Sequence, residues 1–207
     1  MHLAVFQEGP GSANSYVGFD PQTKEAFIVD PGRDDASYEN YLKEHDLKLT
    51  GIVLTHAHFD HIGGVERLRK ATGAKVYIAE TENDLLKDPQ KNLSGMLGEP
   101  SETAGGDVLL KPGDKIRVLP DEELEVLETP GHTRGSICLY GSGILFSGDT
   151  IFEGSIGRTD FPGGSYSDIM HSLDKITALP DDTQILPGHG GITTVGQEKR
   201  TNPFINR

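Results

Sequence analysis

The chain lacks the features that would tie it to an oxidising compartment or a membrane. It holds one cysteine in 207 residues, so no disulfide can form within it. No apolar run approaches the length needed to span a bilayer, and residues 1–6 have neither the basic start nor the apolar length of a signal peptide. We therefore expect a cytoplasmic protein without a membrane partner, in which Cys138 is a buried small side chain and not a nucleophile or ligand.

Positive charge is also scarce. The sequence has 19 lysines and arginines against 32 aspartates and glutamates, which leaves a net charge of −13. Because nucleic-acid binding depends on basic side chains that neutralise phosphates, this balance disfavours a nucleic-acid partner. At 207 residues, with 35% hydrophobic residues, the chain is long enough for one sizeable core, so we expect a single domain over residues 1–207.

Short β-branched and apolar runs alternate with a few amphipathic stretches, which indicates an α/β protein. The runs predict strands at 3–7, 15–19, 25–29, 49–55, 75–79, 115–119, 124–128, 136–140, 144–146 and 184–186. Helical periodicity predicts helices from Asp34 or Asp35, as the capping residue, to 46, and at 65–72 and 166–178. Two packed sheets with helices on both outer faces would bring the strand ends to one edge. Residues 80–113 have the weakest pattern and are interpreted either as a lid or binding segment or as a surface excursion.

One heptapeptide, Thr55–His61, concentrates metal-ligand chemistry at the end of a predicted strand. It holds three histidines and an aspartate as His56-x-His58-x-Asp60-His61. Imidazole nitrogens and carboxylate oxygens are ligands of zinc, iron and manganese. His56 and His58 point the same way in an extended chain, whereas Asp60 and His61 follow at a turn and face a second point. This arrangement favours two metals over one.

Three further polar residues follow apolar strands, and each has a glycine beside it. They are His132, Asp149 and His189. A lone histidine is usually structural, but with the heptapeptide these residues supply five histidines and two aspartates. His2, His45 and His171 are left over: we expect His2 and His45 to face solvent, and His171, in the last predicted helix, to pack or face water, with a place near the site as the alternative.

The ligand block, followed by His132, Asp149 and His189 in that order, resembles the metallo-β-lactamase superfamily over essentially the whole chain. The resemblance implies an α/β (α+β) fold, a four-layer αββα sandwich with the site at one edge. It also implies two divalent metal ions, Zn²⁺ first, although nitrogen and oxygen ligands leave iron and manganese open. By the same resemblance His56, His58 and His132 hold the first metal, Asp60, His61 and His189 hold the second, and Asp149 bridges them.

Within the superfamily the chain is similar to small, single-domain glyoxalase II-like hydrolases. The similar segments are Gly148–Thr150, Gly157–Asp160 and Pro187–Gly190, together with the tail over residues 193–204. Full-length glyoxalase II has an added C-terminal helical glutathione-binding domain, and we expect this protein to act without one. We expect hydrolysis of glutathione thioesters, S-lactoylglutathione first. A metal-bridging hydroxide would attack the carbonyl while Asp60 and Asp149, the predicted catalytic residues, orient it. A thiolate leaves readily, so no strong general acid is needed.

Other functions stay open. Persulfide dioxygenases resemble this family, share a Gly-Arg-Thr-Asp-Phe segment matching residues 157–161, and use one iron held by residues matching His56, His132 and Asp149. A lactonase of the same fold is a further alternative. A purely structural metal is disfavoured, because seven ligands around two metals exceed the four of a closed structural site.

Arg158 is the candidate substrate-binding residue. Glyoxalase II-type enzymes place a basic residue at the matching point after a Gly-x-Gly turn, where it meets the glutathione part of the substrate. A guanidinium pairs with a carboxylate through two hydrogen bonds, and glutathione carries two carboxylates. The alternative is that Arg158 pairs with Asp160 or Glu153 and supports the loop.

Overall fold

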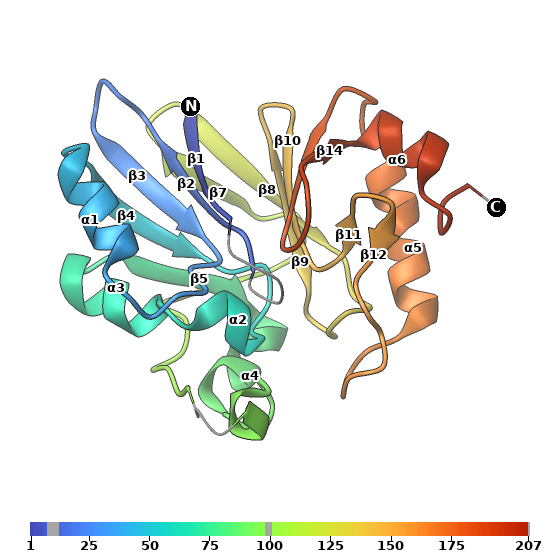
Figure 1. Cartoon of the computed structure of the whole chain (residues 1–207), viewed down its shortest axis with the longest axis horizontal. Coiled ribbons are helices and arrows are strands. Elements are labelled where there is room, and N and C mark those ends of the chain that lie inside the picture. The colour runs from blue at the N-terminus through green and yellow to red at the C-terminus, as the bar shows by residue number, and fades with distance from the viewer. Residues whose placement is uncertain (8–12, 98–100, 207) are drawn as a thin grey trace.

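Two six-stranded β-sheets lie face to face and carry helices on their outer surfaces (Figure 1). The computed structural model describes residues 1–7, 13–97 and 101–206. The first sheet has, in spatial order, β1 (His2–Phe6), β2 (Ser15–Phe19), β3 (Glu25–Val29), β4 (Lys48–Val53), β5 (Lys75–Ala79) and β6 (Val108–Leu110). The second has β14 (Thr193–Thr194), β13 (Gln184–Pro187), β10 (Ile144–Gly148), β9 (Ile137–Gly141), β8 (Glu122–Glu128) and β7 (Lys115–Leu119). A small hairpin pairs β11 (Ile151–Phe152) with β12 (Ser155–Ile156).

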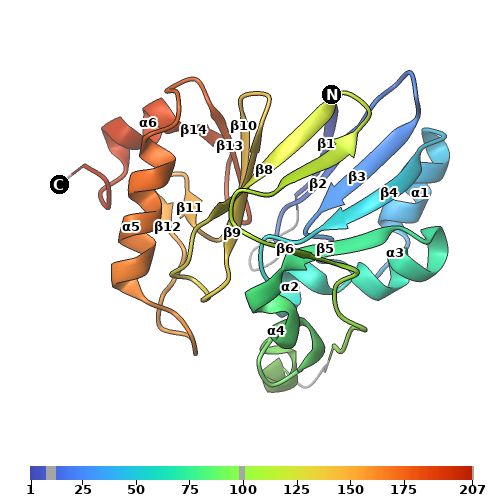
Figure 2. The same ribbon diagram turned by 180° about the vertical axis from the view of Figure 1, so that it is seen from behind.

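The helices complete the outer layers. They are α1 (Ser37–Glu44), α2 (Phe59–Ile62), α3 (Val65–Thr72), α4 (Asn83–Lys87), α5 (Tyr166–Thr177) and α6 (Val195–Thr201), with the 3₁₀ turns η1 (Glu80–Glu82) and η2 (Ser94–Leu97). Helices α1 and α3 cover the outer face of the first sheet, and α5 and α6 cover that of the second, as both views show (Figures 1 and 2). None of these helices, which lie in the described ranges, is long and apolar enough to cross a membrane.

Three apolar clusters separate the four layers. The first lies between α1, α3 and the first sheet and contains Tyr38, Leu68 and Ile52. The second fills the space between the sheets, where the Phe146 ring meets the Tyr16 and Phe27 rings edge-on at centroid distances of 5.6 and 6.1 Å. The third joins the second sheet to α5 and contains the buried Cys138, as expected for a small apolar side chain. The fold is the four-layer αββα sandwich that the sequence predicted.

Strand direction explains why the polar motifs meet. In the first sheet β3, β4 and β5 are parallel, so the chain leaves β3 and β4 at the same edge. In the second sheet β9 is antiparallel to both β8 and β10, and β10 is parallel to β13. Strands β8, β10 and β13 therefore run in one direction and also end at a common edge.

Parts of the fold differ from the sequence prediction, and two of them concern α1 and residues 80–113. Helix α1 begins at Ser37, and its N-cap residue is Ala36, without a side-chain cap. Asp35 accepts the Ser37 N–H two residues on and pairs with Arg33, so the expected capping role for Asp34 or Asp35 is wrong. The weakly patterned segment 80–113 contains η1, α4, η2 and the edge strand β6, while residues 98–100 lie outside the described part.

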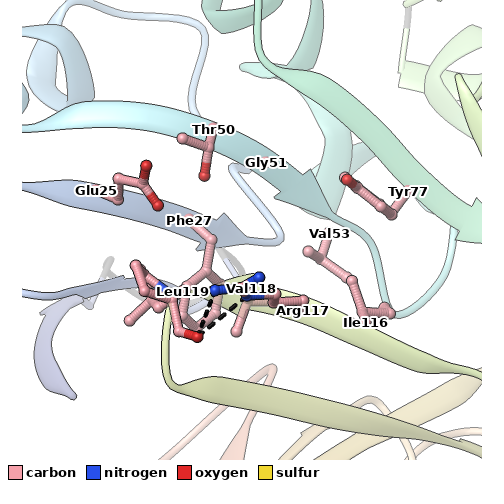
Figure 3. A pocket seen from close by; sticks show the side chains of 11 residues that line it. Glu25, Phe27, Thr50, Gly51, Val53, Tyr77, Ile116, Arg117, Val118 and Leu119 are labelled. Atoms are coloured by element: carbon pink, nitrogen blue, oxygen red, sulfur yellow. Dashed lines mark hydrogen bonds between the residues drawn. The ribbon is translucent and has the colours of Figure 1, made fainter. Parts of the chain in front are cut away.

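A cleft of about 420 Å³ opens between the inner face of the first sheet and β7 (Figure 3). Its floor is apolar and includes Phe27, Val53 and Ile116, while Glu25 and Arg117 lie among its polar lining. Arg117 donates from Nε and Nη2 to the Pro120 carbonyl oxygen. None of the residues that line this cleft is among the histidines and aspartates described below.

Candidate metal centre

All seven candidate ligands lie at the edge where the strands end. His56, His58, Asp60 and His61 follow β4, and the last two lie in the short helix α2. His132 lies beyond the end of β8, Asp149 follows β10 directly, and His189 lies two residues beyond β13. The structure thus brings all seven residues to one edge, with contributions from both sheets.

Three histidines form one group. The Nδ1 atom of His58 lies 2.8 Å from Nε2 of His132, and the His56 ring centre is 4.9 Å from each of their ring centres. The ligand atoms of all three lie within 4.8 Å of one another. The three side chains are almost entirely buried. Three imidazole nitrogens aimed at one small volume are the arrangement that holds zinc or a related divalent metal.

A second group lies beside the first and consists of Asp60, His61 and His189. His189 Nε2 is 3.3 Å from Asp60 Oδ2, and His61 Nε2 is 3.9 Å from the same oxygen. Asp149 connects the two groups, because its carboxylate lies 3.3 Å from His61 Nε2 and 3.5 Å from Nε2 of both His132 and His189. One carboxylate therefore faces ligand atoms of both groups.

A second set of contacts fixes the imidazoles from behind. His61 donates from Nδ1 to Asp30 Oδ2 at 2.9 Å, and His132 donates from Nδ1 to the Arg158 carbonyl oxygen at 2.8 Å. Because each Nδ1 carries the proton, each Nε2 is left to face the centre of the group. Asp30 is itself held by the backbone N–H and the hydroxyl of Thr55, at 2.8 and 2.6 Å.

The His189 loop is held by Asn14. The Asn14 side-chain amide donates to the carbonyl oxygens of Pro187 and Gly190, both at 3.0 Å. The Asn14 backbone N–H donates to the Gly188 carbonyl oxygen. At Gly188 the backbone passes so close to Asp149 that a Cβ atom would collide with Oδ1. The loop can therefore bring His189 against Asp149 only with glycine at this position.

The electrostatics divide the histidines into two kinds. Burial and the neighbouring imidazoles lower the pKa of His58 to about 4 and hold the pKa of His56 well below its ordinary value. Burial also lowers the pKa of His132. These three side chains are neutral at pH 7, which is the form that binds metal.

The other two histidines face carboxylates. Burial opposes their charging, but Asp149, Asp60 and Asp30 together raise the pKa of His61 well above its ordinary value. Contacts with Asp149 and Asp60 outweigh burial in the same way and raise the pKa of His189 to about 9. The pKa of Asp149 is in turn held well below its usual range, since His61 and His189 outweigh the effect of burial. A metal that takes Nε2 of His61 and His189 must therefore displace protons.

The polar atoms themselves fit a metal. Within the described ranges, His56 Nε2, His61 Nε2 and Asp149 Oδ1 are buried and make no hydrogen bond. Buried polar atoms without a hydrogen-bond partner are rare because each carries a desolvation cost, and here His61 Nε2 and Asp149 Oδ1 only face each other at 3.3 Å. Here the three belong to one cluster of nitrogen and oxygen donors, so a shared divalent cation accounts for them together.

A cavity of about 390 Å³ opens over the cluster. Its polar wall contains His58, Asp60, His132, Asp149 and His189. Its lining also has an apolar part, formed by Phe59, Leu93, Phe152, Ile156 and Phe161. Leu93 comes from the segment 80–113, so part of that segment lines the site. The size of the cavity suits a small molecule, with room for an apolar portion beside the cluster.

Arg158 lies at the exposed rim of this cavity. Its Nε and Nη2 donate to the two carboxylate oxygens of Asp160, both at 2.7 Å, and its guanidinium lies 3.7 Å from the Phe161 ring centre. The contact with Asp160 that would give Arg158 a supporting role is thus present. Phe161 meets the His58 ring edge-on at 5.7 Å, so the segment packs against the cluster.

Sequence reasoning missed Asp30 and Asn14. Asp30 begins an Asp-Pro-Gly segment that has the composition of an ordinary turn, although its positive φ of 49° marks a specialised backbone. Asn14 directly precedes β2 and carries no motif. The histidines left aside, His2, His45 and His171, are all exposed, as expected.

Comparison with known families agrees with this geometry. Residues 9–189 match the model of the metallo-β-lactamase superfamily, and the chain belongs to that superfamily. Membership together with the histidine and aspartate cluster supports a metal-dependent hydrolase with a divalent metal site.

Two relatives are similar to this chain over most of their length. The chain is 39% identical over 202 residues to the probable metallo-hydrolase YqgX of Bacillus subtilis, covering 96% of this chain and 94% of the relative. It is 36% identical over 187 residues to the hydroxyacylglutathione hydrolase GloC of Haemophilus influenzae, covering 88% of each.

Three solved structures share the fold over nearly the whole chain. The BLEG-1 B3 metallo-β-lactamase has a TM-score of 0.94 at 40% identity, with full coverage of both chains. ETHE1 from Myxococcus xanthus has a TM-score of 0.83 at 29% identity, covering all of this chain and 86% of that one. TTHA1623 in a di-iron-bound form has a TM-score of 0.84 at 32% identity, covering 97% and 99%.

Asp30 provides a test of how the imidazoles are held. We predict that Asp30→Asn lowers the divalent metal retained by the purified protein, because the asparagine NH₂ group would face either His61 Nδ1 or the Thr55 N–H. In the first case Nδ1 of His61 must accept the hydrogen bond, so the ring proton moves to Nε2 and that nitrogen can no longer bind a metal. In the second case the asparagine NH₂ and the Thr55 N–H are two donors that face each other. Asparagine tolerates the positive φ, so the backbone is not strained.

Elemental analysis of metal per chain is the measurement for this variant. His56→Ala serves as the positive control, and the exposed Asp34→Asn, four residues away, is the matched negative control. Wild-type metal content in Asp30→Asn would show that Asp30 does not set the orientation of His61.

Proposed function

We propose that this protein is a binuclear metal-dependent hydrolase of glutathione-type thioesters, with S-lactoylglutathione as the first candidate substrate. The observation that carries the proposal is the placement of Asp149, within 3.5 Å of ligand nitrogens in both groups. His56, His58 and His132 would hold one metal and Asp60, His61 and His189 the other, with Asp149 between them. Zinc is the expected metal; the di-iron form of TTHA1623 keeps iron open, and manganese also accepts these ligands.

Divalent metals, when bound, lower the pKa of water to about 7 and so supply a hydroxide nucleophile at neutral pH. The chain itself contributes orientation. Asp149 and Asp60 would accept hydrogen bonds from the nucleophile and orient it. Asp149 is only about one-tenth exposed, and both residues line the cavity. The hydrogen bonds that Asp30 and the Arg158 carbonyl oxygen accept from His61 and His132 keep these two rings from turning. A thiolate leaves readily, because an ordinary thiol has a pKa of about 8.5, so no strong general acid is needed.

Similarity to GloC over 88% of both chains supports the glutathione thioester as the substrate class. We further propose that residues 1–207 act as one domain, so the glutathione portion would lie in the cavity over the cluster. The apolar part of the lining would pack against the substrate's carbon chain.

Oxygen dependence tests the proposal most simply. We predict that the metal-loaded protein hydrolyses S-lactoylglutathione at the same rate with and without oxygen, because hydrolysis consumes only water. The measurement is release of glutathione thiol under air and under strict anaerobic conditions. Assays with a β-lactam and a lactone, run on the same preparation, determine whether the thioester is the preferred substrate.

A persulfide dioxygenase is the second candidate, favoured by the fold shared with ETHE1 and by Phe161 of the Gly-Arg-Thr-Asp-Phe segment packing on His58. In that case His56, His132 and Asp149 would hold a single iron. Activity that requires oxygen, with glutathione persulfide preferred to the thioester, would establish this function in place of the first.

Arg158 is the proposed contact for a glutathione carboxylate. Asp160 engages Nε and Nη2, which holds the guanidinium at the cavity rim and leaves Nη1 directed away from that pair. We predict that Arg158→Met raises KM for S-lactoylglutathione by roughly tenfold, the loss expected for a charged contact of about 1.5 kcal/mol, while metal content stays unchanged.

Two comparisons identify the cause of any such change in KM. The effect should vanish for a neutral thioester without the glutathione carboxylates. Arg134→Met removes the same charge from an exposed residue that does not line the cavity, and it should leave KM unchanged. An equal rise in KM for both substrates in Arg158→Met would show that Arg158 supports the loop and does not contact the glutathione carboxylates.

A further inference from the structure

Glu82, at the end of η1, joins two of the ligand loops from behind. Its side chain is fully buried, and its two carboxylate oxygens each accept one backbone N–H. Oε2 accepts from Ala57 at 3.1 Å, and Oε1 accepts from Gly135 at 2.9 Å. Ala57 lies between His56 and His58, and Gly135 lies three residues beyond His132. One carboxylate therefore connects the two chain segments that supply the three-histidine group.

The surroundings are shaped for this carboxylate. A Cβ atom on Gly135 would lie 2.7 Å from Glu82 Cγ and 2.8 Å from Oε1, so a larger residue there would displace the side chain. Within the described ranges, Glu82 forms no ion pair. Burying a carboxylate without a cation is costly, and the two neutral N–H groups, together with a hydrogen bond from the Thr133 side chain, offset only part of the cost.

We propose that Glu82 is a positioning residue for the His56–His58–His132 group. Its two hydrogen bonds set the separation between the loop after β4 and the loop after β8, and so hold the three imidazoles close enough to share one metal. The inference rests on the metal centre of the proposed function and is independent of the substrate. Outer contacts of this kind typically change metal affinity by about 10- to 100-fold.

The experiment compares metal affinity in matched variants. Glu82→Gln keeps the size of the side chain but places an NH₂ group against one of the two N–H donors. Glu82→Asp keeps the charge but is shorter by one methylene, so it cannot reach both loops. Glu80→Gln is the control, because Glu80 lies in the same turn with a side chain that is 59% exposed.

Each metal-free protein is titrated with Zn²⁺ in competition with a chromophoric chelator. The dissociation constant is calculated from the concentration of folded protein. Co²⁺ is then added separately, and its visible absorption reports the ligand geometry. We expect both Glu82 variants to bind at least about tenfold more weakly than wild type with an altered Co²⁺ spectrum, and Glu80→Gln to match wild type. If Glu82→Gln fails to fold, Glu82→Asp provides the comparison.

Two results would overturn the inference. Wild-type affinity and spectrum in Glu82→Gln, with only a lower unfolding temperature, would give Glu82 a purely structural role. Wild-type affinity in Glu82→Asp with a loss in Glu82→Gln would mean that charge alone matters. Thioester turnover by the loaded wild type is measured separately, so failure of the proposed substrate leaves this comparison intact.

Discussion

The contact of one buried carboxylate with three imidazoles is the interaction on which the edge of this sandwich depends. Asp149 lies directly after β10, and it meets His61 from the first sheet and His132 and His189 from the second. A carboxylate at this depth requires positive partners, since its desolvation is otherwise uncompensated. The two sheets are thus joined at this edge by charge as well as by the apolar core between them.

The side chains around that contact are held in place by the fold. Asp30 and the Arg158 carbonyl each accept a hydrogen bond from an Nδ1 proton, and Asn14 fastens the loop that carries His189. Glycines at 157 and 188 admit the close approach of neighbouring backbone, because a Cβ at either position would collide with Asp149. The ordering of the site therefore occurs during folding, and little conformational freedom remains to be lost when a cation binds.

Much of this arrangement could be predicted from local sequence, because periodicity and ligand chemistry are local signals. The largely apolar run at 25–29 and the helical pattern at 65–72 each predict an element, and both are present. The meeting of His56, His132, Asp149 and His189 followed from the expectation that two packed sheets with helices on their outer faces bring their strand ends to one edge.

What could not be predicted depends on tertiary contacts. Asp30 belongs to an ordinary turn in sequence, and only the approach of Thr55 and His61 gives it a role. The two-residue strands β11, β12 and β14 exist through pairing, which short segments do not encode. The Asp35 side chain turned back to the Ser37 N–H, a competition between a turn and a helix cap that spacing does not decide.

The most direct test of the account is the number of divalent metal ions that the wild-type chain binds. Metal-free protein would be titrated with Zn²⁺ in a calorimeter, and the fully loaded protein would be checked by elemental analysis. Two metal ions per chain are expected, since Asp149 faces two separate sets of nitrogen and oxygen donors. Saturation at one metal per chain would contradict the binuclear centre and the hydrolytic function built on it.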